Sequence, residues 1–180
     1  MPSLALAVPA VLAAASLATF AASPALVEAE RIDASGAMVT YGETLQDAPQ
    51  ARVRAEYDTV GDTRVELSVT GLEAATRYAG RVHVGGCERR RRDLGEVFQA
   101  TPNPDPAGAP QDPAYRNPGN EVWLDLETDA AGTGSVAARQ PWQFHPTRRP
   151  GSVIIHEMLP VSHPLDPIVG PALACLEVGF

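Results

Sequence analysis

The chain has 180 residues and a mass of 19.0 kDa, which is enough for one domain of ordinary size but not for two with separate cores. With 44% hydrophobic and 20% charged residues it can bury a core, which excludes a disordered or collagen-like polymer. The formal net charge of −8 argues against a nucleic-acid binder, because an acidic surface repels polyanions.

The first residues are typical of an export signal. Residues 4–20 form an uncharged run rich in Ala, Leu and Val, interrupted by Pro9, and small residues follow as signal peptidase requires. We predict a signal peptide over residues 1–25 and a single domain over 26–180, secreted or placed in the cell envelope or periplasm. No stable membrane span is expected after cleavage. Retention as an anchor is the alternative, because no Arg or Lys precedes the apolar run.

The sequence contains two cysteines, Cys87 and Cys175. An oxidising exterior allows a disulfide to persist, so we predict that they form one. The alternative is a pair of buried thiols. The bond would close a loop across most of the domain.

The predicted secondary structure is β throughout, because apolar and polar residues alternate with period two and no stretch keeps helical periodicity over three turns. In chain order the predicted strands are 31–41, 51–57, 63–70, 78–84, 121–128, 135–138, 152–156 and 173–178. The second and third flank Val60-Gly61-Asp62 and should pair as an antiparallel hairpin. These eight short strands predict an all-β sandwich or flattened barrel.

One long segment, residues 85–119, has no clear strand. It contains six prolines in its second half, which exclude it from a sheet ladder and lower the entropy cost of ordering it. Long loops of this kind are often functional. The alternative is a linker between two small domains.

Several motifs occur in a familiar order: RYAGRVHVGGC at 77–87, the long loop, PGSVIIHE at 150–157 and GPALACLEVGF at 170–180. Together they resemble the copper/zinc superoxide dismutases over roughly residues 71–180. The resemblance implies an eight-stranded Greek-key β-barrel or sandwich with one intrachain disulfide and a long Pro-rich loop in place of the metal-binding loop. It also implies which positions would hold the metal.

The copper positions implied by the resemblance are only half retained. The His-x-His pair of the family corresponds here to Arg81 and His83, and the bridging histidine corresponds to Val97. His156 matches the last copper ligand, so His83 and His156 are remnant ligands and two of four remain. The arginine that guides superoxide in the family aligns with Ala172.

Zinc is not expected, because residues 98–120 contain no histidine and a lone carboxylate near residues 121–125 does not make a four-ligand site. We hypothesise that the Arg81 guanidinium occupies the space of the missing metal and donates to nearby carboxylates or carbonyls, with Glu157 as a partner if its side chain turns inward. His145 and His163 lie in proline-flanked turns, where we expect solvated side chains; the alternative is that either one moves to complete a metal site.

Two further groups have a functional and a simpler interpretation. Arg89, Arg90, Arg91 and Arg92 could dock an anionic envelope polymer, but a solvated loop is the simpler prediction. The aromatic residues Trp123, Trp142 and Phe144 are expected to pack in the core or at strand edges.

The sequence therefore predicts an exported superoxide dismutase-like protein without a complete copper/zinc site, catalytically inactive and without a cofactor, with a structural or binding role. The alternative is a divergent copper-binding protein or copper-only superoxide dismutase using His83 and His156. The expected partner is an unidentified protein or envelope component, with a homodimer compatible and nucleic acid excluded. Whether the protein is an enzyme stays open, with an inactive protein favoured.

Overall fold

The computed structural model describes residues 30–45, 47–57, 61–88, 90, 93–107, 112–145, 147–159 and 169–180. Within these residues the chain forms nine β-strands and no α-helix, which confirms the all-β prediction. The strands are β1 (Arg31–Ala37), β2 (Val39–Thr40), β3 (Gln50–Tyr57), β4 (Thr63–Thr70), β5 (Arg77–His83), β6 (Leu126–Glu127), β7 (Gly134–Gln140), β8 (Ser152–Met158) and β9 (Val169–Glu177).

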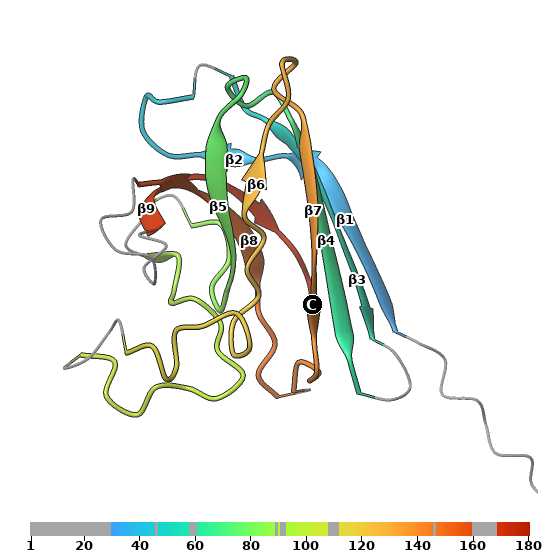
Figure 1. Ribbon diagram of the computed structural model, residues 1–180, viewed down its shortest axis with the longest axis vertical. Helices are drawn as coiled ribbons and strands as arrows, with labels where there is room; N and C mark the ends of the chain where they lie inside the picture. Colours follow the sequence, from blue (N-terminus) through green and yellow to red (C-terminus); the bar gives the residue numbers. More distant parts are fainter. Residues whose placement is uncertain are drawn as a thin grey trace, which may run out of the picture.

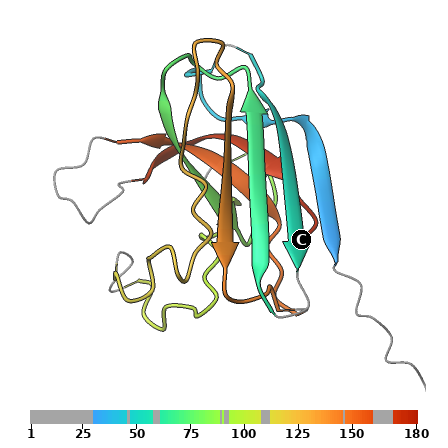
Figure 2. The same ribbon diagram turned by 45° about the vertical axis from the view of Figure 1, so that its right-hand side comes forward.

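The strands assemble into two antiparallel sheets that lie face to face (Figures 1 and 2). The four-stranded sheet has the order β1-β3-β4-β7 and the five-stranded sheet the order β2-β9-β8-β5-β6. The segment between β5 and β6 lies outside the five-stranded sheet, on the side away from the four-stranded sheet (Figures 1 and 2). We call this segment, residues 84–125, the covering segment. Its residues Gly95, Trp123 and Asp125 contact the buried side chains of the candidate site described below.

Alternation explains the four-stranded sheet directly. In β3 the side chains of Val53 and Ala55 are fully buried, whereas Arg52 and Arg54 are exposed. The predicted hairpin is confirmed, since β3 pairs antiparallel with β4 and Tyr57 lies opposite Thr63. One face of the sheet therefore meets the core and the other meets water.

The structure corrects two predicted strands. The segment 31–41 is divided at Met38 between the two sheets: β1 pairs with β3, whereas β2 pairs with β9. The segment 121–128 forms a ladder only at β6, with isolated bridges from Glu121 to Gln99 and from Trp123 to Arg81. Alternation was present in both segments, but alternation reports which side chains point inward and not how far a neighbouring strand extends.

The core between the sheets ends in an aromatic cluster around Phe144. Its ring contacts those of Phe98 and Phe180 at centroid distances of 5.0 Å, and that of Trp142 at 5.6 Å. Phe144 is buried and Trp142 packs against the core, so both are structural as predicted.

The predicted disulfide between Cys87 and Cys175 is present, and the sequence separation of the two cysteines is 88. Closing so long a loop in the unfolded chain contributes about 4 kcal/mol of stability in the chain-entropy model. The bond joins the start of the covering segment to β9.

Candidate functional site

The candidate site lies on the side of the five-stranded sheet that points away from the four-stranded sheet. In β5 the side chains of Tyr78 and Val82 enter the core, so Arg81 and His83 point to the opposite face. The neighbouring strand β8 contributes His156 on the same side, opposite Ala79. Because the covering segment shields this face, Arg81, His83 and His156 are buried, at 1%, 5% and 8% exposure.

The two histidines face each other through their Nε2 atoms, which lie 3.1 Å apart. His83 Nδ1 lies 3.0 Å from the carbonyl oxygen of Gly95, and His156 Nδ1 lies 3.1 Å from that of Gly170. A carbonyl oxygen can only accept, so these partners assign an N–H to both Nδ1 atoms and a lone pair to both Nε2 atoms. With both N–H groups used at the carbonyl oxygens, the two neutral rings face each other through their Nε2 lone pairs, and a hydrogen bond between the Nε2 atoms forms only when one of them carries a proton.

The surroundings disfavour the protonated form of both rings. Burial lowers the pKa of His83 to about 4, and the charge of Arg81 acts in the same direction. Burial also lowers the pKa of His156 to about 4, with further contributions from His83, Arg81 and Arg116. At neutral pH both rings are therefore uncharged.

Arg81 is held beside this pair by three contacts. Its Nη1 donates to the carboxylate of Asp125 and to the carbonyl oxygen of Gly80 at 2.6 Å. Its guanidinium carbon lies 4.5 Å from the ring centroid of Trp123, in cation–π contact. The expected donation to a carboxylate and a carbonyl is confirmed, but the carboxylate is that of Asp125, and Glu157 is exposed. Among the described residues Arg81 Nε has no hydrogen-bond partner.

The remaining carboxylate near the site serves the structure of the covering segment. Glu121 is almost fully buried and accepts hydrogen bonds from Gln99 Nε2 at 2.9 Å and Trp123 Nε1 at 2.8 Å. Trp123 therefore connects this network to the Arg81 guanidinium. The sequence predicted Trp123 as packing only and did not identify Asp125 as the partner of Arg81.

The donors present do not fit the metal centre that the resemblance implies. Val97 forms a bridge with His83, but its side chain has no atom that could bind a metal. Within the part of the chain that the structure describes, no group of three or more His, Cys, Asp or Glu residues is placed to hold a metal ion. Two imidazole nitrogens next to a guanidinium form neither a four-histidine copper site nor a four-ligand zinc site.

The Pro-rich part of the covering segment is fixed by amide and indole side chains. Asn120 Nδ2 donates to the carbonyl oxygens of Thr101 and Tyr115, at 2.9 and 2.7 Å. Trp142 Nε1 donates to the carbonyl oxygen of Gly119 at 2.8 Å. These contacts hold the described residues of the Pro-rich part in place outside any strand ladder.

Of the other predicted residues, those that the structure describes do not join the site. His145 is exposed and its Nδ1 lies 2.8 Å from the hydroxyl of Thr147, while Ala172 is buried. Arg90 is exposed. The rest of the arginine run and the last histidine, namely Arg89, Arg91, Arg92 and His163, lie outside the described residues, as does the predicted signal peptide at 1–25.

Comparison with protein-family models gave no match, and comparison with curated proteins gave none either. In the described residues no helix is long and apolar enough to cross a membrane. The similarity to the copper/zinc superoxide dismutases rests on the motifs quoted above.

Proposed function

We propose that this protein is an exported, superoxide dismutase-like domain that lacks a complete copper/zinc centre and has a structural or binding role instead of a catalytic one. The observation that carries the proposal is the buried guanidinium of Arg81, which is paired with Asp125 and packed on Trp123 at a position where the family has a copper ligand. In this proposal the two-sheet fold of the family is retained, and the buried arginine Arg81 stands where the family has a copper-binding histidine.

The electrostatics of the site support this proposal. A guanidinium stays protonated at any ordinary pH, so Arg81 places a permanent positive charge beside the two histidines. The same charge that lowers the pKa of His83 and His156 opposes a metal cation at their Nε2 atoms. A redox metal would have to overcome this repulsion with only two imidazole donors.

The strand order supports the family fold. After β4 the chain crosses to the other sheet for β5 and β6, then returns so that β7 pairs with β4. It then crosses again, and β8 pairs with β5. Connections that pass over both sheets in this manner are typical of a Greek-key sandwich.

The disulfide supports export. Disulfides persist in secreted, periplasmic and cell-surface proteins and are rare where thiols are kept reduced. The bond between Cys87 and Cys175 is therefore consistent with the extracellular or periplasmic location predicted from the first residues.

The test is a metal titration and a dismutase assay on the disulfide-linked protein, compared with the variant Arg81→His/Val97→His. This variant restores imidazoles at the two changed positions. We expect the unmodified protein to bind no stoichiometric copper and to dismutate superoxide no faster than buffer without protein. The variant should gain copper affinity. One tightly bound copper per unmodified chain, with rapid dismutation, would contradict the proposal.

A second candidate function is copper binding by His83 and His156 alone. It is favoured by the tautomers assigned above, because both Nε2 lone pairs face each other across 3.1 Å and both rings are held by carbonyl oxygens. Copper content measured on His83→Ala and His156→Ala distinguishes the candidates. A loss of bound copper in both variants favours the second candidate, and unchanged content favours the first.

A further inference from the structure

The exposed side of the four-stranded sheet, which we call the outer face, consists of the outward-pointing residues of β1, β3, β4 and β7. The strand register aligns Ser35, Arg52, Ser68 and Ser135 directly across all four strands. The outer face therefore carries a row of three hydroxyl groups around one guanidinium. No part of the candidate site lies on this side of the molecule.

A groove follows this row. A depression of about 550 Å³ is lined by the four residues of the row together with others that include Gln50, Thr70 and Thr133. A second depression of about 350 Å³ continues along β4 and β7. Both are lined by Ser68 and Ser135, so the two depressions adjoin at these residues, and we refer to them together as the groove. The first depression alone has the size of an ordinary small-molecule site.

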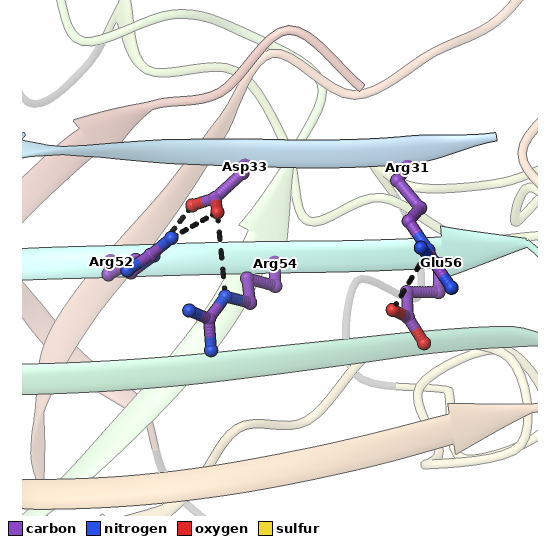
Figure 3. Close-up of polar contacts among 5 residues, drawn as sticks. All are labelled: Arg31, Asp33, Arg52, Arg54 and Glu56. Carbon is purple, nitrogen blue, oxygen red and sulfur yellow. Dashed lines mark hydrogen bonds and ion pairs between the residues drawn. The ribbon is translucent and has the colours of Figure 1, made fainter.

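The charges beside the groove are not balanced. Asp33 accepts hydrogen bonds from both Arg52 and Arg54, so one carboxylate serves two guanidinium groups (Figure 3). These hydrogen bonds and charges lower the pKa of Asp33, with the bond from Arg52 as the largest contribution, and keep the carboxylate ionised. The other ion pair in the view, between Arg31 and Glu56, is balanced (Figure 3).

The rest of the outer face does not repeat this imbalance. The four strands carry five arginines and three carboxylates, and Asp62 beside β4 pairs with Arg139, so one guanidinium is in excess. This excess positive charge lies at Asp33, beside the groove, on a chain with a net charge of −8. A second copy of the chain is a poor occupant, because a twofold contact would place the excess guanidinium of one copy on the same face as that of the other.

We propose that the groove of the outer face binds a carboxylate-bearing oligosaccharide. The hydroxyl and amide groups of the lining match the hydroxyl groups of sugars, which both donate and accept. The guanidinium of Arg52, oriented by Asp33, takes the carboxylate of one sugar unit by charge-assisted hydrogen bonds. The described residues that line the groove include no aromatic ring, so hydrogen bonds and charge provide the affinity and stacking does not.

The test is calorimetric titration of the disulfide-linked protein with an oligogalacturonate, using a neutral maltooligosaccharide of equal length as the control ligand. Arg52→Gln removes the charge in the groove, and Arg31→Gln removes an equal charge from the same face outside the groove. We expect Arg52→Gln to weaken oligogalacturonate binding about ten-fold or more, as for loss of a charge-assisted hydrogen bond, and Arg31→Gln to leave it within about two-fold. Ser68→Phe, which fills the point shared by both depressions, should abolish binding.

Four results would overturn the proposal. They are equal binding of the neutral oligosaccharide, equal weakening by Arg52→Gln and Arg31→Gln, and full binding by Ser68→Phe. The fourth is a dimer in sedimentation that Ser68→Phe dissociates, because the face would then be an interface between copies. Thermal melting of each variant checks the fold, and Ser135→Phe replaces Ser68→Phe if the latter melts early.

Discussion

The ion pair between Arg81 and Asp125 gives the sharpest test of how the site is stabilised. The substitution Asp125→Ala leaves a guanidinium that is 1% exposed without its carboxylate partner. Removing one member of a buried ion pair costs about 3–5 kcal/mol, because the remaining charge stays desolvated. The Asp125 side chain is 29% exposed, so water compensates in part and we expect about 3 kcal/mol, the low end of that range.

The free energy of unfolding should be measured by urea denaturation with the disulfide intact. For a chain of 180 residues, a loss of about 3 kcal/mol corresponds to a decrease in Tm of about 6–12 °C. Glu127→Ala, which removes the same charge from an exposed position of β6, is the matched control and should change stability by less than about 0.5 kcal/mol.

The double variant Arg81→Met/Asp125→Leu separates the charge effect from packing. Replacing both partners by apolar residues removes the unpaired charge, so most of the loss should be recovered. If Asp125→Ala is as stable as the control, Arg81 does not depend on this carboxylate, and the account of the site given above is wrong.

Three further predictions concern the histidines, the disulfide and the loop. Because the pKa of both His83 and His156 is lowered to about 4, the unfolded chain binds protons that the folded chain does not, so stability falls as pH decreases from about 6.5 to 4, by about 1.4 kcal/mol per pH unit for each histidine. Urea denaturation across this range should show a smaller pH slope in the double His→Gln variant, and an equal slope would refute the assignment. Replacing Cys87 and Cys175 by Ser should lower the free energy of unfolding by about 4 kcal/mol, and a loss below about 1 kcal/mol would contradict the chain-entropy argument. Asn120→Ala removes two donations to loop carbonyls and should speed limited proteolysis of the Pro-rich segment without a comparable change in Tm, whereas an unchanged cleavage rate would show that other contacts hold the loop.

The pattern of residues was most informative where a strand has one face in water. The alternation in β3 and β4 predicted their bounds to within one residue and also their pairing, because each outward residue is polar and each inward residue except Thr63 is apolar. The same rule placed Arg81 and His83 on one face of β5. It failed at Met38, where the chain changes sheets without losing its alternation.

The contacts that define the site were beyond the reach of local patterns. Asp125 and Trp123 approach Arg81 from more than forty positions away, and the two carbonyl oxygens that orient the histidines belong to Gly95 and Gly170. Gly95, Trp123 and Asp125 lie in the covering segment and Gly170 lies in β9, so these contacts depend on how both parts fold against β5 and β8. The residue types in the sequence show only which groups need partners, not which groups become those partners.

The place of β9 has a consequence for the order in which the molecule can form. β1, β3 and β4 pair with near neighbours in sequence, so this part of the sandwich can assemble as soon as the ribosome has delivered residue 70. β2 must wait for β9, more than a hundred residues later, and β8, which can pair with β5, lacks its second neighbour until β9 is made. Until synthesis reaches that point, the hydrophobic side of the early meander lacks its opposing layer, and during this interval the nascent chain is most exposed to aggregation or chaperone capture.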